Sequence, residues 1–284
     1  MMNLSEVRIV TDSSADILEL PGITTAQAPL KINTAEAEYV DTPALDVTAM
    51  THALHGYKGK SGTTCPSMGA FLDAFGDAKY IFCLTMTSKL SGTYNVAVSA
   101  AREYMETYPD RKVCVIDSRN TGPGMQLLAE KIVQLLGEGM EFDEVCERVS
   151  AYRFETELLF LLESLNNLAN NGRVSRTVAK IAGFLGIRML GAAVEGVIKP
   201  LQKPRGSVKA LDVTFEQMLE FGYHGGKVRI SHCENLFAAE ELRKRILAKY
   251  PEADVTVYPA RALCSFYAEY GGMILGFETG DELC

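Results

Sequence analysis

Three times in its first half the chain repeats one order: a short apolar run, a polar loop rich in serine, threonine or glycine, and a helical pattern. The runs and loops read VRIV–TDSSAD, YIFCLTM–TSKLSGT and KVCVID–SRNTGPG. Repeated strand–loop–helix units predict a parallel sheet, because parallel neighbours need a long crossover, usually a helix. The loops after parallel strands gather at one sheet edge, where ligands usually bind. After the second loop, an amphipathic helix is predicted to bury Tyr94, Val98, Ala101 and Met105.

The second half mixes short strands, a hairpin and separate helices. TELLFLLE predicts a strand, SRTVAKIAGFLG a helix capped by Ser175, and IRMLGAAVEGVIKPLQ two strands around a Glu195–Gly196 turn. KVRISHC, ADVTVYP and GGMILGFE predict further strands, and LFAAEELRKRILAKY predicts a helix. We therefore predict an α/β protein of two domains, a parallel-sheet α/β domain over residues 1–155 and a two-layer α+β domain over residues 156–284.

Composition limits the classes of function. The chain has 284 residues, of which 47% are hydrophobic and 23% charged, so it can bury a core in each of two domains. A net charge of −8 argues against a general nucleic-acid or anionic-membrane surface. No apolar run is long enough to span a bilayer, and strand-like sequence begins at once, without a signal peptide. Seven cysteines without a CxxC pair fit a reducing cytoplasm.

Hydroxyl side chains in two loops are candidate ligands for an anion. Ser91, followed by Gly92, stands between a strand and a helix, where backbone N–H groups and the helix dipole favour a carboxylate or phosphate. Thr63 and Thr64 precede a helix that Pro66 opens. Each of these hydroxyls is equally explained as a plain helix cap, which for Ser91 is the commoner role of serine at such a position.

Residue patterns of known catalytic machinery are absent from the sequence. His52 and His55 share a helical spacing but have no third ligand nearby, so we expect no metal site. No phosphate-binding loop, dinucleotide fingerprint or GxSxG elbow occurs, and we expect neither a cofactor nor an enzyme. The enzymatic alternative uses Ser91 as a nucleophile, or Asp12 and Asp117 as acid and base, but no base stands beside Ser91.

Two arginines lie in distinctive settings. Arg173 follows a helix-ending glycine in NNGRVSR, and Arg205 follows a strand in QKPRG. Exposed arginines are usually solvated charges. As a pair in an acidic protein they are compatible with a small basic docking patch.

Six segments together resemble the DegV family of fatty-acid-binding proteins, in order from about residue 7 to about residue 277: VRIVTDSSAD, GTTCPSMGAF, TSKLSGTYNVAVSAA, VIDSRNTG, LNNLANNGRVSR and IKPLQKPRG. The resemblance implies two α/β domains with a lipid tunnel between them and one bound long-chain fatty acid of the palmitate, stearate or oleate type. Some family members are the acyl-binding subunit of a fatty-acid kinase. A separate ATP-using subunit then phosphorylates the carboxylate, and the acyl phosphate feeds phospholipid synthesis.

Carried over by position, the resemblance assigns the carboxylate to Thr63 and Ser91, with Thr64 and Gly92 beside them. It assigns Arg173 and Arg205 to the carboxylate neighbourhood or to kinase docking. Family members often place a histidine near the carboxylate, in a glycine-rich stretch before the last strand. Here that stretch reads SFYAEYGGMILGF, and we expect Glu269 or Tyr270 at the histidine's place.

Apolar residues after Arg173 are candidates for the acyl tunnel, with ordinary core packing as the alternative for each: Ile181, Phe184, Leu185, Met189 and Leu190. The sequence thus predicts a carrier that presents a fatty acid to a partner kinase. The alternatives are a lipid sensor or carrier without a kinase, and a serine hydrolase. Chain length of the lipid and oligomeric state are not encoded in any motif of the sequence.

Overall fold

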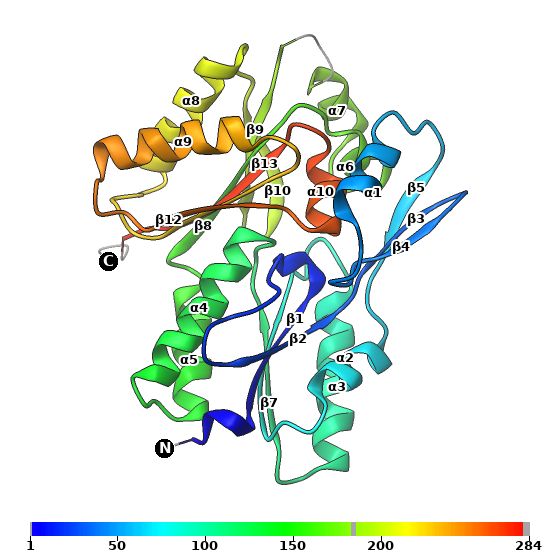
Figure 1. Ribbon diagram of the computed structural model, residues 1–284, viewed down its shortest axis with the longest axis vertical. Coiled ribbons are helices and arrows are strands. Elements are labelled where there is room, and N and C mark those ends of the chain that lie inside the picture. Colours follow the sequence, from blue (N-terminus) through cyan, green and yellow to red (C-terminus); the bar gives the residue numbers. More distant parts are fainter. Residues whose placement is uncertain (1, 183–185, 281–284) are drawn as a thin grey trace.

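A four-stranded parallel sheet organises the first half of the protein, of which a computed structural model describes residues 2–182 and 186–280, with side chains omitted for 180–182. Its order is β2-β1-β6-β7, and every neighbouring pair is parallel. The strands are β1 Val7–Asp12, β2 Thr24–Ala28, β6 Tyr80–Thr85 and β7 Lys112–Asp117. The predicted parallel sheet is confirmed, and the carboxyl ends of its strands point toward the second half (Figure 1). Short 3₁₀ turns, Leu4–Glu6 and Ser13–Ala15, flank β1.

Helices cover both faces of this sheet. One face packs against α2 Met68–Phe75 and α3 Thr93–Thr107, and the other against α4 Pro123–Gly137 and α5 Phe142–Tyr152. The α3 helix confirms the predicted element but not its buried face. The residues it buries are Thr93, Ala97, Ala100, Ala101 and Tyr104, and Met105 is 37% exposed. Its alanines allow a close approach to the sheet, which moves the buried stripe away from Met105.

A small antiparallel sheet between the halves was not predicted. Its order is β4-β3-β5, with β3 Lys31–Thr34, β4 Glu38–Val40 and β5 Ser61–Thr64, and α1 Val47–Leu54 connects β4 to β5. Figure 1 shows this sheet at the side of the molecule near α1 and α6. It places Thr63, in register with Ile32, next to the second half.

A six-stranded mixed sheet forms the second half, in the order β10-β9-β8-β13-β11-β12. Its strands are β8 Thr156–Leu162, β9 Met189–Val194, β10 Val197–Gln202, β11 Val228–His232, β12 Val255–Pro259 and β13 Met273–Glu278. The six predicted strands are confirmed, including the β9–β10 hairpin, whose Glu195 and Gly196 have φ of 52° and 77°. Both turn residues therefore adopt the left-handed conformation that a two-residue hairpin favours.

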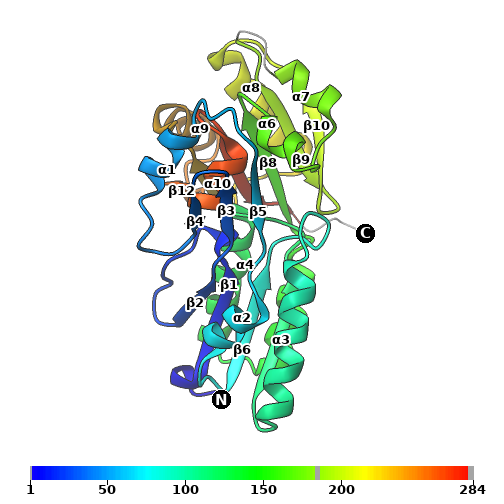
Figure 2. The same ribbon diagram turned by 90° about the vertical axis from the view of Figure 1, so that its right-hand side faces the viewer.

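Helices flank this sheet as well. α8 Ser207–Glu220 and α9 Leu236–Lys249 pack on one face, and short helices lie on the other: α6 Asn166–Asn170, α7 Arg176–Ala182 and α10 Ala262–Ala268 (Figure 2). α10 also inserts Leu263 and Phe266 into the core of the first half. The two halves thus share one helix, and the predicted domain boundary near residue 155 stays a prediction. Within the described residues, no helix combines the length and the apolar character needed to cross a bilayer.

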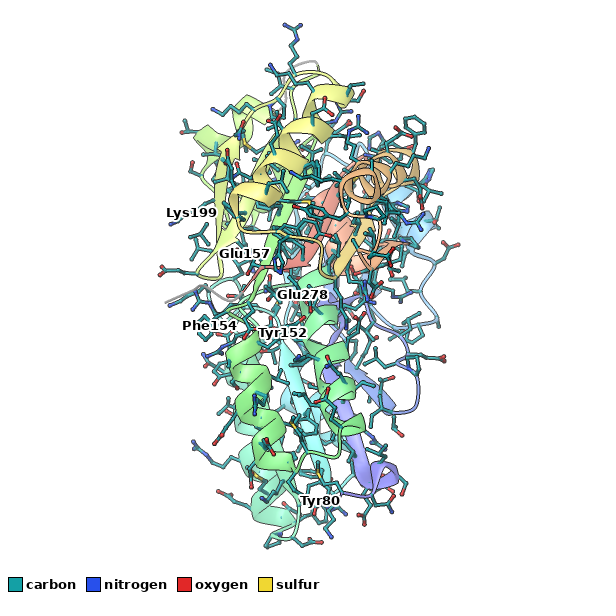
Figure 3. The ribbon with its side chains drawn as sticks, turned by 90° about the vertical axis from the view of Figure 1, so that its left-hand side faces the viewer. Tyr80, Tyr152, Phe154, Glu157, Lys199 and Glu278 are labelled. Carbon is teal, nitrogen blue, oxygen red and sulfur yellow. The ribbon has the colours of Figure 1, made fainter. Side chains whose placement is uncertain are left out.

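Polar contacts lock the two halves together beside α4. The guanidinium of Arg229 on β11 donates two hydrogen bonds of 2.7 Å to the carboxylate of Glu130 on α4, and further ones to Asp254. Nearby, the Tyr152 hydroxyl donates to Glu278 at 2.5 Å, where α5 meets β13 (Figure 3). The Arg229 side chain is only 7% exposed, so this contact belongs to the interior of the molecule.

Candidate functional site

A cavity of about 480 Å³, here called the main cavity, opens between the loop after β6, β5 and α10. Its polar lining comes from both halves and comprises Thr63, Ser88, Lys89, Ser91, Asn95, Thr121, Arg173 and Tyr267. Its apolar lining includes Leu90, Leu168, Ile198 and Ile274. The volume lies within the range of about 300–1,000 Å³ that small-molecule sites occupy.

Two hydroxyl groups meet at one wall of the main cavity. The Thr63 Oγ1 atom on β5 lies 2.7 Å from the phenolic oxygen of Tyr267 on α10, and either can donate. Burial, the largest effect, raises the pKa of the Tyr267 hydroxyl, so this group is a neutral donor at physiological pH. The pair offers hydrogen bonds to an anion without placing a charge against it.

Ser91 lines the same cavity from the loop between β6 and α3. Its Oγ lies 2.8 Å from the Thr93 hydroxyl and accepts the Thr93 backbone N–H at 3.3 Å, while Gly92 is the N-cap of α3. Ser91 therefore shapes the first turn of the helix and also faces the cavity. The structure brings three of the predicted carboxylate ligands, Thr63, Ser91 and Gly92, to one cavity.

Thr64 does not share that cavity. Successive residues of a strand point to opposite sides, and the Thr64 Oγ1 atom accepts a hydrogen bond from Asn33 Nδ2 at 2.9 Å on the exposed side. The assignment of Thr64 to the carboxylate site is therefore not supported by its geometry.

The residue near Thr63 on the glycine-rich stretch is Tyr267, and neither Glu269 nor Tyr270 takes that place. Glu269 ends α10 with a φ of 56°, and its carboxylate accepts the backbone N–H of Asn167 at 2.8 Å. Tyr270 is 43% exposed and packs on the ring of His55. The end of the helix explains the difference, since α10 ends at Ala268 and the positive φ of Glu269 turns the chain in a new direction before Tyr270.

Arg173 lies at the edge of the main cavity, whereas Arg205 does not. The Arg173 guanidinium donates to the carbonyl oxygens of Leu90 at 3.3 Å and Asn171 at 2.5 Å, and its carbon lies 5.7 Å from the Tyr267 ring centre. Arg205 is exposed and forms an isolated bridge with Ile187. The two arginines therefore do not line the same cavity, and the basic docking patch stays a prediction.

An apolar extension of about 60 Å³ continues the main cavity toward the mixed sheet. It shares six lining residues with the main cavity and adds the strand residues Leu158, Phe160, Leu162 and Ala193. Gly191 makes room for this wall, because a Cβ at that position would come within 2.2 Å of the Phe160 ring. The apolar lining of the main cavity and this extension together form the part of the site that suits an alkyl tail.

The predicted tunnel residues have different positions. Met189 is fully buried in the cluster that contains Leu158 and Phe160, next to the extension. Leu190 packs in the core beneath α8 and α9, on the opposite face of the sheet, because neighbouring strand residues alternate. Leu190 is therefore no tunnel residue. Phe184, Leu185 and the side chain of Ile181 lie outside the described residues.

Asp12 and Asp117 position loops. Asp12 accepts hydrogen bonds from the backbone N–H groups of Ser14 at 3.0 Å and Met86 at 2.7 Å, and Asp117 accepts that of Ser88 at 3.2 Å. Burial raises the pKa of Asp12 to about 6. Neither residue lines the main cavity.

The described lining of the main cavity contains no histidine, aspartate or glutamate that could act as a base toward Ser91. Across the described part of the chain, no three His, Cys, Asp or Glu side chains are grouped to hold a metal ion. What the arrangement offers chemically is a polar end, where the neutral hydroxyls of Thr63 and Tyr267 lie in one cavity with Lys89 and Arg173, and an apolar channel at the other end.

Comparison with known proteins places this geometry in a family. The family model described as "Uncharacterised protein, DegV family" matches residues 6–278. A DegV domain-containing protein of Streptococcus pneumoniae is 39% identical over 276 residues, covering 95% of this chain and 98% of that protein.

Solved structures agree over the same length. A DegV family protein from Eubacterium eligens, loaded with heptadecanoic acid, is 44% identical with a TM-score of 0.94, and the match covers 96% of this chain and 100% of that one. The Fatty Acid Kinase B3 protein of Streptococcus pneumoniae, loaded with linoleic acid, is 38% identical with a TM-score of 0.94, covering 96% and 99%. The predicted α/β fold is thereby confirmed, and the chain belongs to the DegV family.

Proposed function

We propose that this protein binds one long-chain fatty acid, with the carboxylate at Thr63, Tyr267 and Ser91 and the tail along the apolar lining of the main cavity and into the apolar extension. The observation that carries the proposal is the union of a neutral hydroxyl cluster and an apolar channel in one continuous space. Relatives with 44% and 38% identity hold heptadecanoic and linoleic acid. Lipids of the palmitate, stearate or oleate type are the corresponding ligands here.

The tail supplies most of the binding free energy. About 14 buried methylenes, at about 0.8 kcal/mol each, give on the order of 11 kcal/mol before costs. Lost translational freedom and ordering of the tail take back several kcal/mol or more. The remainder is enough for tight binding, so the head-group contacts need only orient the carboxylate.

We also propose that the protein presents the carboxylate to a separate kinase. The described part of the cavity lining holds no acid–base pair for chemistry of its own, and a structural relative is the Fatty Acid Kinase B3 protein of Streptococcus pneumoniae. Arg173 suits this role, since backbone carbonyls hold its guanidinium at the cavity edge, where a partner protein can reach it. A cytoplasmic location suits the six free thiols among the described cysteines.

Mass spectrometry of an organic extract tests lipid binding. The purified protein should release close to one fatty acid per chain, and delipidated protein should take up added palmitate with the same stoichiometry. Protein that is empty as purified and does not bind added palmitate contradicts the proposal.

A pull-down with lipid-loaded protein tests the partner. The presentation role requires an ATP-dependent activity in the captured fraction that phosphorylates the bound lipid. Arg173→Ala should lower this phosphorylation while its bound lipid stays stoichiometric, and Arg148→Ala, at an exposed position on α5, is the matched control. Stoichiometric lipid with no captured kinase activity would instead support a lipid sensor or a carrier without a kinase.

A further inference from the structure

Two cysteines face each other where α5 packs against the edge of the parallel sheet. Cys114 lies on β7, the last strand in the order β2-β1-β6-β7, and Cys146 lies on α5. Both side chains pack against the same hydrophobic core, and the Cys146 thiol forms a hydrogen bond with Cys114. The fold therefore brings two thiols from distant parts of the sequence into contact.

An ion pair fixes the position of the start of α5 against the start of β7. Lys112 Nζ on the strand lies 2.7 Å from Asp143 Oδ2 on the helix. Cys114 follows Lys112 by two residues and so projects from the same face of the strand. Cys146 follows Asp143 by three residues and so lies on the same face of the helix. The thiol pair is therefore the next contact along the line that the ion pair begins.

A second polar contact holds the other ends of the same two elements. Arg153, the residue that caps the end of α5, donates from Nη1 to the backbone carbonyl of Asp117, the last residue of β7, at 2.9 Å. Strand and helix are thus held together on both sides of the two cysteines. This arrangement keeps the two sulfur atoms in contact rather than leaving their approach to chance motion.

Both thiols can be reached from solvent at this edge of the sheet. Cys114 and Cys146 are partly exposed, whereas Cys83, Cys233 and Cys264 are buried. Cys83, on the neighbouring strand, packs in the core on the opposite face of the sheet, because strand residues alternate. Within the described chain, Cys146 is therefore the thiol that Cys114 can reach.

The contact gives the two sulfurs different acidities. The hydrogen bond from the Cys146 thiol, the largest effect, lowers the pKa of Cys114, and the same bond raises the pKa of Cys146. Cys114 therefore ionises first, while Cys146 keeps its proton. A thiolate beside a protonated thiol is the arrangement of an attacking and a resolving cysteine in proteins that react with peroxides.

We propose that Cys114 and Cys146 form a peroxide-sensitive dithiol that closes to an intramolecular disulfide between β7 and α5. The Cys114 thiolate attacks one oxygen of hydrogen peroxide, the O–O bond breaks, and the departing hydroxide takes up the proton that Cys114 lost, which gives water. Cys114 is then a sulfenic acid. The Cys146 sulfur attacks the Cys114 sulfur, the S–O bond breaks, and the departing hydroxide takes the Cys146 proton as a second water. Both sulfurs are oxidised and the peroxide is reduced.

This modification site is separate from the proposed lipid site. Neither cysteine lines the main cavity, so the proposal does not depend on fatty-acid binding.

Peptide mapping of the full chain tests the proposal. Reduced protein is treated with hydrogen peroxide, the remaining thiols are alkylated, and a digest made without reductant is analysed by mass spectrometry. The peptides of Cys114 and Cys146 should appear joined, lighter than their sum by two hydrogen atoms, and a reductant should separate them. The same two thiols should be lost together from the alkylated fraction.

Three serine variants separate the roles of the cysteines. Cys146→Ser should stop the reaction at the sulfenic acid of Cys114, which dimedone traps, and Cys114→Ser should give neither the sulfenic acid nor the cross-link. Cys65→Ser, at another partly exposed cysteine, is the matched control and should form the cross-link as the wild type does. Circular dichroism shows whether each variant is folded, and if one is not, the map of the wild-type protein still decides.

Two results overturn the proposal. In the first, Cys114 and Cys146 both stay open to alkylation at a peroxide dose that fully oxidises glutathione added to the same sample. In the second, either cysteine is found joined to a different cysteine, or to a second chain, in place of this pair.

Discussion

Replacing Tyr267 by phenylalanine removes one oxygen from the main cavity and keeps the ring that lines it. The lost hydroxyl lies 2.7 Å from Thr63 Oγ1, where it can donate to a bound carboxylate. A hydrogen bond to a charged group contributes about 1.5–3 kcal/mol, which corresponds to roughly 10- to 150-fold in Kd. Because Thr63 remains and can turn its own hydroxyl to the ligand, we expect the lower end of this range, about 10- to 30-fold.

The assay is displacement of a fluorescent fatty acid by palmitate, at lipid concentrations below aggregation. Two matched controls come from the same segments: Tyr270→Phe removes an exposed hydroxyl outside the main cavity, and Thr64→Val alters the neighbour of Thr63 that faces away. Both should leave the Kd of palmitate within about twofold, as expected for surface changes. Palmitate methyl ester lacks the charge, so its Kd should differ much less between wild type and Tyr267→Phe than the Kd of palmitate does.

Thr63→Val completes a double-mutant cycle with Tyr267→Phe. The two hydroxyls contact each other, so their effects on the binding free energy should not add. An unchanged Kd in Tyr267→Phe refutes the head-group assignment. An equal loss in Tyr270→Phe refutes it too, because it would show that the effect does not come from the main cavity.

Three further predictions follow from the packing and the titrating groups. Arg229→Met should destabilise the fold by about 3 kcal/mol in urea unfolding, the lower end of the range for a broken buried ion pair, because the partly buried carboxylate of Glu130 keeps only Lys227 at 3.5 Å, and Glu130→Gln should cost less. Since the pKa of Asp16 rises from 3.8 to about 8 on folding, the native state binds more protons between these values. The free energy of unfolding should therefore decrease as pH rises through this window, and Asp16→Asn should flatten the decrease. Gly191→Ala should shift the copurifying lipid toward shorter chains, because its Cβ meets the Phe160 ring and moves it into the extension; an unchanged lipid profile would contradict that wall assignment.

Much of the fold could be predicted because it is encoded locally. The runs that became β6 and β7 are each followed by a polar loop and a helix, α3 and α4, and this order indicates a parallel sheet. The helix predicted after β1 was wrong, because a short 3₁₀ turn and then β2 follow that strand. The same argument predicted that Ser91 lies at the edge of the sheet where ligands bind, and Ser91 does line the main cavity. The alternation of strand residues was also readable from the sequence, and applied to Met189 and Leu190 it would have placed the two on opposite faces.

Tyr267 could not be found in the same way. It lies on a helix of seven residues, and its contact with Thr63 joins positions 204 residues apart. No local pattern signals such a contact, and the β3–β4–β5 sheet that carries Thr63 was itself missed. Sites made by packing of distant segments depend on the tertiary arrangement, which propensity and periodicity do not specify.

The hydrogen-bond donors around the proposed carboxylate position are better suited to presenting the fatty acid to a kinase than to holding its carboxylate as tightly as possible. A guanidinium clamp on the carboxylate would form two strong charge-assisted bonds and occupy both oxygens. In this protein the donors that meet at the cavity wall, Thr63 and Tyr267, are neutral, and the one arginine in the described lining donates from Nε and Nη1 to the carbonyls of Leu90 and Asn171. A carboxylate held by hydroxyls keeps its charge and an oxygen free to attack. Affinity then comes from the tail, so the head group can be held weakly enough to react without the lipid being lost.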